Sequence, residues 1–542
     1  MTTLSFEAAG AAREAVDAKV PSLVGDEVAS RLVAQDPTRW GPDAEAEASI
    51  RLGWLNPGES SRPLLGQIAA LREELAAESV TRVVLAGMGG SSLAPEVITR
   101  TAGVDLTVLD STDPDAVAAA LADRLAETVI VVSSKSGSTV ETDSQRRVFE
   151  KAFTDAGIDA ASRIVVVTDP GSPLDSAARE AGYRAVFNAD PNVGGRYSAL
   201  TAFGLVPSGL AGADIETLLD DAEMTAEILR DDAPDNIGLE LGAALGGTEP
   251  LRNKIVIVDE GSGLAGFPDW AEQLIAESTG KLGTGVLPVV VGPGAPETTS
   301  GAADVLTVRI VPVDSEELPE GDQVVVSGSL GSQMMLWEFA TAVAGRLLNI
   351  NPFDQPDVEA AKKAARGLLD ATPEPTDPAF VDGSVEVRGP AELLGTAGTL
   401  RGALTALLGR LGSDGYLSIQ AYLDRFTQAG LADIRGELAA ATGRPVTFGW
   451  GPRFLHSTGQ FHKGGPAQGV YLQITGRPAG DVSIPERPFS FGELISAQAA
   501  GDASVLAGQG RPVLRLHLLN QGEGIREIEN VVRSLAAESG NK

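Results

Sequence analysis

The chain has 542 residues and 43% hydrophobic residues, which is enough for several domains with substantial cores and excludes wholesale disorder. A formal net charge of −32 repels polyanions and argues against binding to nucleic acid or to an anionic membrane surface. The absence of cysteine excludes disulfides and thiolate catalysis, and it removes the ligands of most structural zinc sites.

The first 60 residues have helical patterns that Trp40-Gly41-Pro42 and Asn56-Pro57-Gly58 interrupt. We expect a helical arm packed on the first domain. The first nine residues contain no basic segment followed by an apolar core, and no apolar run reaches the roughly 18 residues that span a bilayer. A cytoplasmic protein without membrane contact is therefore expected.

Short apolar runs alternate with helical patterns in two consecutive stretches, which predicts two parallel α/β sandwiches. The predicted strands of the first are Val83–Ala86, Leu106–Leu109, Val129–Val132, Ile164–Thr168 and Ala185–Phe187. Those of the second are Lys254–Val258, Val289–Val291, Leu306–Ile310 and Val324–Val326, followed by an amphipathic helix over Met334–Leu348. We expect the arm and first domain to span residues 1–225 and the second domain residues 226–371, with a cleft between them.

A third α/β region is expected at residues 372–542. It begins with a proline-rich linker, Thr372–Pro378. Its predicted strands are Tyr416–Gln420, Pro445–Phe448, Val470–Thr475 and Val513–Leu518, with a final helix near Ile525–Leu535.

Small hydroxyl residues cluster at Ser133–Thr142, between a predicted strand and a predicted helix. Unpaired backbone N–H groups and the helix dipole favour an anion at such a place. The alternative is an ordinary helix N-cap formed by Ser138 or Thr139. A second small-residue turn, Gly87–Ser92, follows another strand of the same sheet and favours the anion. It matches neither a dinucleotide fingerprint nor a P-loop, so a small phosphorylated ligand is expected.

Three further segments carry charged residues in contexts that suit catalysis. Glu277 falls in the last turn of a helix predicted over Phe267–Lys281, Arg196 lies in the turn Gly194–Ser198, and Lys362 ends the segment Asn351–Lys362. Each also has an ordinary structural interpretation, as an exposed carboxylate, a surface arginine or a structural lysine.

These five motifs occur in the order of the signature stretches of glucose-6-phosphate isomerases, and the chain resembles that family. It is especially similar to the actinobacterial form and to the isomerase half of transaldolase–isomerase fusions. The resemblance implies two sugar-isomerase (SIS) domains, each a parallel sheet flanked by helices, and a homodimer with its sites at the subunit interface. It also implies chemistry without a cofactor or a metal ion.

The resemblance also implies roles for individual residues. The substrate-binding residues would be Ser134, Lys135, Ser136 and Thr139 around the phosphate, with Gly90 and Ser91 near the sugar and phosphate. Glu277 would move a proton between C1 and C2 of the sugar, Arg196 would stabilise the enediolate, and Lys362 would assist ring opening. An aldose–ketose shift needs only one carboxylate that can reach both carbons, together with cations that face the oxyanion.

The match departs from the family pattern at the histidine. The stretch Gly328–Gln333, where much of the family has one, has none, and Asp357 and Ala361 stand where glycines are common. His456 lies in Leu455–Gln460, which resembles a family stretch that precedes the lysine motif. The third region must therefore return to the cleft, or the ring-opening histidine must come from another subunit.

The remaining histidines have other expected roles. His462 and Lys463 are expected to flank the same pocket, and His462 with His456 also raises a weaker alternative of metal binding. His517 lies in an apolar strand and is expected to be structural.

The sequence thus predicts interconversion of glucose 6-phosphate and fructose 6-phosphate through a cis-enediol, a step of glycolysis and gluconeogenesis. The alternatives are another phosphosugar isomerase and a sugar-phosphate-binding regulator without catalysis.

Overall fold

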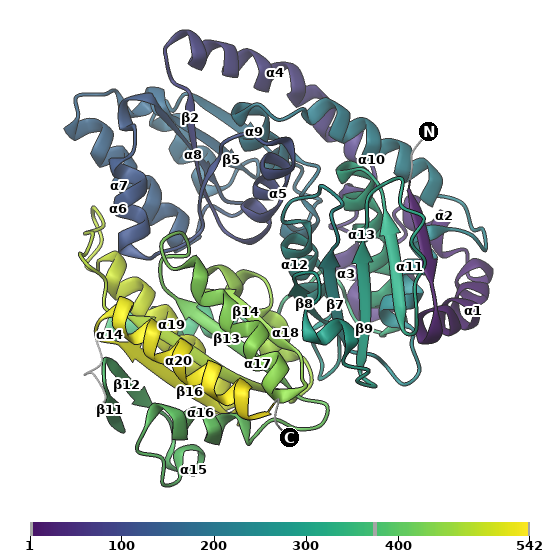
Figure 1. The fold of residues 1–542 in the computed structure, drawn as a ribbon. Coiled ribbons are helices and arrows are strands. Elements are labelled where there is room, and N and C mark those ends of the chain that lie inside the picture. Colours follow the sequence, from purple (N-terminus) through teal and green to yellow (C-terminus); the bar gives the residue numbers. More distant parts are fainter. Residues whose placement is uncertain (1–3, 372–376, 540–542) are drawn as a thin grey trace.

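The computed structural model describes residues 4–371 and 377–539. Three β-sheets, each covered by helices, make up the described chain, and Figure 1 shows them as three bodies. The predicted fold class, α/β with two parallel-sheet sandwich domains and a C-terminal α/β region, is confirmed. Residues 372–376, which form most of the predicted linker, lie outside the described residues.

The first sheet is entirely parallel, in the order β3-β2-β4-β5-β6. Every residue of β2, β4 and β5 is buried, because helices cover both faces of the sheet, and this explains their valine-rich sequences. The strands are β2 (Arg82–Gly87), β3 (Thr107–Leu109), β4 (Thr128–Ser133), β5 (Ile164–Thr168) and β6 (Ala185–Asn188). The helices are α5 (Leu93–Ala102), α6 (Pro114–Ala122), α7 (Val140–Asp155), α8 (Pro173–Glu180) and α9 (Ala202–Ala211).

The second sheet has the order β1-β10-β9-β7-β8, with four parallel strands and one antiparallel edge strand, β1. Its strands are β1 (Ser5–Ala8), β7 (Lys254–Asp259), β8 (Leu287–Val291), β9 (Val305–Ile310) and β10 (Gln323–Ser327). Its helices are α10 (Ile215–Leu229), α11 (Ile237–Gly246), α12 (Phe267–Thr279) and α13 (Leu330–Leu347).

The N-terminal arm does not pack on the first domain alone, which corrects the expectation from the sequence. Its helices are α1 (Gly10–Gly25), α2 (Val28–Val33), α3 (Pro42–Ala48) and α4 (Pro57–Ala77). Only α4 packs along α9 of the first body, whereas α1 packs on α11 and β1 covers the edge of β10 in the second. The Trp40 indole also donates to the carbonyl of Ala342 on α13, at 2.9 Å. A boundary at residue 225 therefore divides strands that are paired in one sheet.

The third sheet has the order β11-β12-β16-β15-β13-β14, parallel except for β11 and β12. Its strands are β11 (Phe380–Asp382), β12 (Val385–Arg388), β13 (Tyr416–Tyr422), β14 (Val446–Trp450), β15 (Gly469–Gly476) and β16 (Val513–Leu518). Its helices are α15 (Ala391–Leu394), α16 (Leu400–Leu408), α17 (Ile434–Thr442), α18 (Gly459–Gly464), α19 (Phe491–Gly508) and α20 (Gln521–Ser539).

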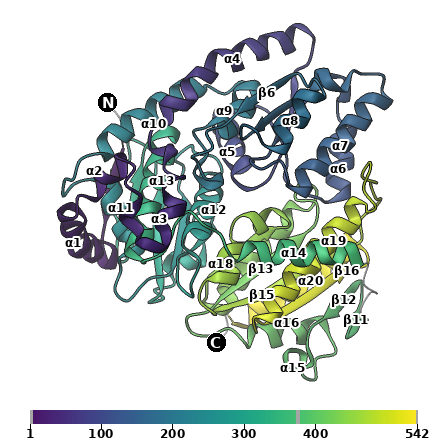
Figure 2. The same ribbon diagram turned by 180° about the vertical axis from the view of Figure 1, so that it is seen from behind.

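Helix α14 (Val358–Ala371) packs against α19 of the third body, although the sequence assigned it to the second domain. The two helices approach so closely that a Cβ on Gly501 would lie 2.8 Å from the backbone nitrogen of Ala365. Figure 2 shows α14 beside α19 from behind. Since α14 carries Lys362, this packing links the lysine to the body that carries His456.

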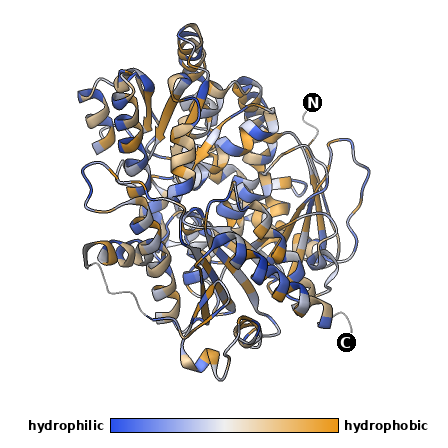
Figure 3. Cartoon of the chain, turned by 60° about the vertical axis from the view of Figure 1, so that its left-hand side comes forward, coloured by the Kyte–Doolittle hydropathy of each residue, from blue (hydrophilic) through white to orange (hydrophobic). Residues whose placement is uncertain are grey.

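Buried hydrophobic residues of the strands and of the helices that cover them form the cores, and orange in Figure 3 marks hydrophobic residues along the chain. Short 3-10 helices complete the described secondary structure: η1 (Pro37–Trp40), η2 (Gly53–Leu55), η3 (Gly89–Ser91), η4 (Leu125–Glu127), η5 (Ala160–Arg163), η6 (Gly195–Tyr197), η7 (Pro296–Thr299), η8 (Ala429–Asp433) and η9 (Arg453–His456). Among the described residues, each helix is too short or too polar to cross a bilayer.

Candidate active site

One cavity of about 480 Å³ lies where the three bodies meet. It is lined by the catalytic and substrate-binding residues that the family resemblance implied: Gly90, Ser91, Ser134, Lys135, Ser136, Thr139, Arg196, Glu277, Lys362 and His456. The fold thus brings together residues that are up to 366 positions apart, from Gly90 to His456, in a single chain.

The hydroxyl-rich loop between β4 and α7 is closed on itself by hydrogen bonds. Ser134 Oγ donates to Thr139 Oγ1 at 3.2 Å, and Ser136 Oγ lies 2.7 Å from Ser138 Oγ. Thr139 occupies the N-cap of α7 but its side chain makes no capping bond, which argues against the ordinary N-cap interpretation. The Gly137 backbone has a φ of +69°, and a Cβ there would lie 2.5 Å from Leu174. The loop lines the cavity and leads into the N-terminus of α7, a setting in which hydroxyls and the N–H groups of the first helical turn suit an anion.

The lining of the cavity is positively charged, although the whole chain is strongly acidic. Its cations are Arg51, Lys135, Arg196, Lys362 and Arg366, and its carboxylates are Glu141, Asp169 and Glu277. Lys135 pairs with Asp169 at 2.8 Å. Burial raises the pKa of Asp169, and Lys135 only partly offsets this. A chain with a net charge of −32 repels a phosphorylated ligand overall, but the excess of cations in this one cavity gives such a ligand a favourable local environment.

The turn that carries Arg196 rests directly on the glycine turn after β2. A Cβ on Gly90 would lie only 1.9 Å from the carbonyl oxygen of Gly195, so a larger residue would push η3 and η6 apart. Arg196 is 4% exposed, and its guanidinium donates to the carbonyls of Pro352 and Asp354 at 3.0 and 2.8 Å. These bonds fix its charge in one orientation beside the cavity.

Both oxygens of the Glu277 carboxylate have partners. Arg196 Nη1 lies 3.0 Å from Oε1, and Gln273 Nε2 donates to Oε2 at 3.0 Å. Gln273 Nε2 also donates to the carbonyl of His456 at 2.7 Å, so it joins the second body to the third. Sequence reasoning missed Gln273. Its position four residues before Glu277, on the same face of α12, was the available signal.

His456 enters the cavity from η9, after β14 of the same chain. Its Nε2 lies 3.2 Å from Oε1 of Glu141, a buried carboxylate in the first turn of α7 that also accepts from Gln498 Nε2 at 2.7 Å. Burial alone would raise the pKa of Glu141, but the hydrogen bond and charge of His456 outweigh it, and the pKa is lowered. Glu141 lies inside the motif Ser133–Thr142, yet sequence reasoning did not single it out.

Lys281, a further cation in the glutamate motif, does not line the cavity. Its Nζ donates to the carbonyls of Asn351 and Asp354 at 2.7 and 2.6 Å and to Asp354 Oδ1 at 2.7 Å. Burial and the nearby Arg196 lower its pKa to about 8. Lys281 therefore supports the loop that leads into α14.

The expectation that His462 and Lys463 flank the pocket is wrong, because α18 turns both side chains into the interior of the third body, His462 toward β13 and Lys463 toward α19. His462 Nδ1 lies 3.0 Å from the Tyr416 hydroxyl, and Lys463 pairs with Asp502 at 2.6 Å. His517 lies in β16, with its Nδ1 2.9 Å from Thr475 Oγ1. In residues 4–371 and 377–539, no three His, Asp or Glu side chains gather as a metal site would require.

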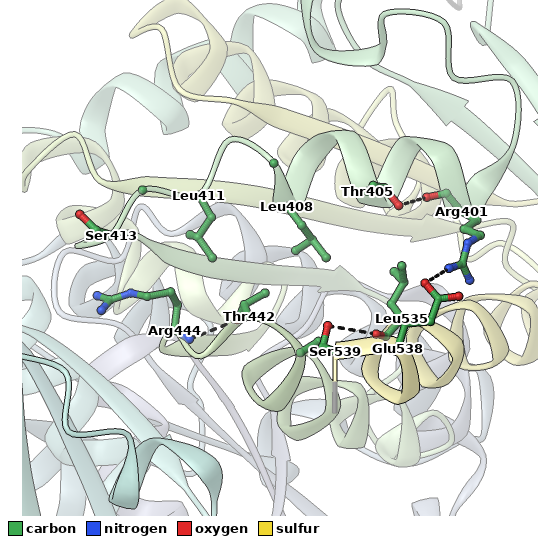
Figure 4. Close-up of a pocket in the computed structure, with 13 residues that line it drawn as sticks. Arg401, Thr405, Leu408, Leu411, Ser413, Thr442, Arg444, Leu535, Glu538 and Ser539 are labelled. Carbon is green, nitrogen blue, oxygen red and sulfur yellow. Dashed lines mark hydrogen bonds and ion pairs between the residues drawn. The ribbon is translucent and has the colours of Figure 1, made fainter. Parts of the chain in front are cut away.

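A second hollow, of about 700 Å³, opens on the third body between α16, α17 and α20 (Figure 4). None of the candidate site residues lines it. Its arginines are already engaged, Arg401 with Glu538 at 2.6 Å and Arg444 with Asp304. The first cavity is therefore the candidate active site.

Comparison with known proteins agrees with this choice. A family profile described as phosphoglucose isomerase matches residues 69–282. A protein from Haloarcula marismortui described as "Probable glucose-6-phosphate isomerase" is 30% identical over 340 residues, which cover 53% of this chain and 78% of that protein. The chain belongs to the glucose-6-phosphate isomerase family. The glucose-6-phosphate isomerase of a Cyanothece strain is 29% identical over 348 residues, and the match spans 53% of this chain and 66% of that protein, just under two thirds.

Two solved structures share the fold of this glucose-6-phosphate isomerase family member. A hypothetical protein from Thermus thermophilus has a TM-score of 0.56 and 26% identity, and the match covers 68% of this chain and 99% of that one. A glucose-6-phosphate isomerase from Chlamydia trachomatis has a TM-score of 0.50 and 20% identity, with coverage of 62% and 78%.

Proposed function

We propose that the chain is a glucose-6-phosphate isomerase that interconverts glucose 6-phosphate and fructose 6-phosphate through a cis-enediol. The observation that carries this proposal is the convergence of a hydroxyl-rich loop, the buried carboxylate of Glu277, five cations and an imidazole on one cavity of about 480 Å³. Membership of the family supports the same reaction.

The sugar phosphate binds at the loop before α7. Ser134, Ser136 and Thr139 turn their hydroxyls from one another toward the phosphate oxygens, and the first turn of α7 contributes its N–H groups. Lys135 supplies a positive charge from the same loop, and Gly90 and Ser91 form the adjacent wall.

Glu277 is the base that transfers the proton between the two carbons. As a carboxylate it removes a proton from C1 of open-chain fructose 6-phosphate, which leaves an enediolate with its charge on the C2 oxygen. The hydroxyl proton on the C1 oxygen passes to the C2 oxygen, and Glu277 returns its proton to C2, which gives the aldose. Arg196 lies 3.0 Å from Glu277 and is held by loop carbonyls, so its charge faces the oxyanion as it forms without needing to reorganise.

His456 and Lys362 open the sugar ring before this step. The imidazole donates a proton to the ring oxygen, the anomeric hydroxyl gives its proton to solvent water, and the C–O bond of the ring breaks, which leaves the open-chain carbonyl form. Glu141 holds the imidazole at 3.2 Å and so fixes its orientation in the cavity. Lys362 lines the same cavity from α14 and stabilises the oxygen that gains negative charge.

Quaternary structure and location complete the proposal. The family resemblance points to a homodimer in the cytoplasm, and sedimentation velocity on the purified protein would test the dimer. The site residues of one chain already line one cavity, so we propose that each subunit carries its own complete site.

The decisive experiment is a coupled assay of purified protein with fructose 6-phosphate, beside the Glu277→Gln variant. The amide keeps the shape of the side chain but cannot accept the proton, so we expect a loss on the order of 10²–10⁴-fold with substrate binding retained. Glu272→Gln, on the same helix but outside the cavity, is the matched control and should keep its activity.

Two outcomes would redirect the proposal. Faster turnover of another phosphosugar in a panel that includes mannose 6-phosphate would indicate a different isomerase. Binding of 6-phosphogluconate in calorimetry without turnover of any sugar in the panel would indicate a sugar-phosphate-binding regulator.

A further inference from the structure

The end of α12, which carries Glu277, and the start of α14, which carries Lys362, meet at the side chain of Gln460 in α18, the helix that follows His456. Gln460 Nε2 donates to Asp357 Oδ2 at 2.7 Å and to the carbonyl of Gly280 at 2.9 Å, and its Oε1 accepts from the backbone nitrogen of Asp357 at 3.0 Å. The Gln460 side chain is fully buried.

Each of these three positions lies within about one turn of a proposed catalytic residue. Gly280 follows Glu277 by three residues at the end of α12, Asp357 precedes Lys362 by five just before α14, and Gln460 follows His456 by four in α18. The bonds therefore connect the second body to the segments that supply the lysine and the histidine.

The backbone around this contact is packed too tightly for side chains. A Cβ on Gly464 would lie 2.2 Å from Asp357 Oδ2, and a Cβ on Gly280 would lie 2.4 Å from the Cα of Phe461. The Gly464 carbonyl also accepts from the backbone nitrogen of Gly283 at 2.9 Å. Glycines thus let α18 approach the end of α12 and the start of α14 directly.

An amide is the side chain that fits these three bonds, because it offers two N–H donors and one carbonyl acceptor. A glutamate at position 460 would place a second carboxylate beside Asp357 and would lose the bond to Gly280. Asp357 itself stands where the family resemblance leads us to expect a glycine, which has no side chain to contribute. Asp357 is therefore the member of this contact that departs from the family pattern, and the hydrogen-bonded set Gln460, Asp357 and Gly280 is called the clamp below.

We propose that Gln460 and Asp357 are positioning residues that set the distance between His456 and Lys362 and their placement relative to Glu277. This inference rests on the proposed function. Neither side chain lines the cavity, so their effect on the reaction passes through the residues they hold. Because both proposed ring-opening residues depend on the clamp, its loss should slow ring opening more than the proton transfer at Glu277.

The test compares Gln460→Met with wild type on cyclic fructose 6-phosphate and on erythrose 4-phosphate, an acyclic aldose phosphate. Misplacement by about 1 Å can cost on the order of 100-fold, so we expect a fall in kcat of tenfold or more on the cyclic substrate and a much smaller fall on the acyclic one. The matched control is Gln468→Met. Gln468 also joins the second and third bodies, accepting from Lys254 Nζ at 2.8 Å and donating to Asp414 Oδ2 at 2.7 Å, but outside the cavity.

Two variants at position 357 keep the test decisive if Gln460→Met folds poorly. Asp357→Asn retains an acceptor for Gln460 and should stay near wild type, whereas Asp357→Leu removes the acceptor and should show the same selective loss. Equal losses on both substrates, or no loss with either Gln460→Met or Asp357→Leu, would overturn the inference.

A spectroscopic measurement separates failure of the inference from failure of the proposed function. The chain has three histidines, so the imidazole signals of His456 can be assigned with a His456→Ala variant. Gln460→Met should shift those signals and Gln468→Met should not, whether or not the protein isomerises sugars. Unchanged signals in Gln460→Met would overturn the clamp itself, and absence of wild-type isomerisation with shifted signals would overturn the proposed function alone.

Discussion

Subunit complementation would decide whether the histidine acts within its own chain. Glu277→Gln lacks the base and His456→Ala lacks the imidazole, so each variant alone should be nearly inactive on cyclic substrate. In the structure one chain supplies both residues, and Gln273 joins them through bonds of 3.0 Å to Glu277 and 2.7 Å to the His456 carbonyl. Every site of a mixed dimer would then keep one of the two lesions.

The two arrangements differ by an amount that a coupled assay resolves easily. If each site lies within one chain, a co-expressed equimolar mixture has no more activity than the mean of the two variants. If the histidine crossed to a partner's site, half of the randomly formed dimers would be mixed and each would regain one intact site, which gives about one quarter of wild-type activity. Recovery near that level would refute the assignment of His456 to its own chain. Affinity-tagged co-expression would confirm that mixed dimers had formed.

The strands of the sheets were predictable where burial dominates their composition. Helices cover both faces of the first sheet, so β2, β4 and β5 are apolar at nearly every position and stand out without any knowledge of the fold. Strand β1 was missed because it alternates exposed and half-buried residues and gains its place by pairing with β10, which lies more than 300 residues later. The antiparallel strands β11 and β12 were missed because, besides being short, each includes charged and partly exposed positions, so no apolar run marks them.

The residues of the site were predictable where local chain geometry demands particular residue types. The hydroxyl loop and the glycine turns stand out because anion binding and close backbone approach allow few substitutes, as Gly90 against Gly195 shows. Glu141 and Gln273 were not predicted. Their importance arises from contacts with a histidine 315 and 183 residues away, which no local pattern encodes.

The packing of α14 shows why domain assignment from chain order failed at that helix. Its sequence follows the second sheet, but it packs against α19, which the chain reaches about 130 residues later. The consequence is functional, because Lys362 and His456 then belong to one packed unit that meets Glu277 across the cavity. The histidine motif can therefore follow the lysine motif in this sequence and still place His456 and Lys362 in the same cavity.

Three further predictions test the binding loop, the histidine and the anchoring of its segment. Ser136→Asp combined with Thr139→Asp should raise KM sharply and weaken binding of 6-phosphogluconate in calorimetry, because carboxylates would face the phosphate at a helix N-terminus; unchanged affinity would place the phosphate elsewhere. His456→Ala should lose far more rate on cyclic fructose 6-phosphate than on acyclic erythrose 4-phosphate. Equal losses on the two substrates would mean that the imidazole helps to shape the pocket and does not act in ring opening. The last prediction concerns Glu96, which pairs with Arg453 at 2.6 Å and thereby ties the histidine segment to the first body. Burial raises the pKa of Glu96, but the charges of Arg453 and its neighbour Arg425 outweigh burial and hold the pKa at about 2. Since this value lies below the ordinary 4.5, the charged pair contributes its full stability above pH 4.5 and loses it as the pH falls toward 2. Urea unfolding of wild type and Glu96→Gln should therefore give a difference in unfolding free energy that is largest near neutral pH and shrinks below pH 4.5. A difference that stays constant from pH 7 to pH 3 would mean that the carboxylate contributes shape rather than charge.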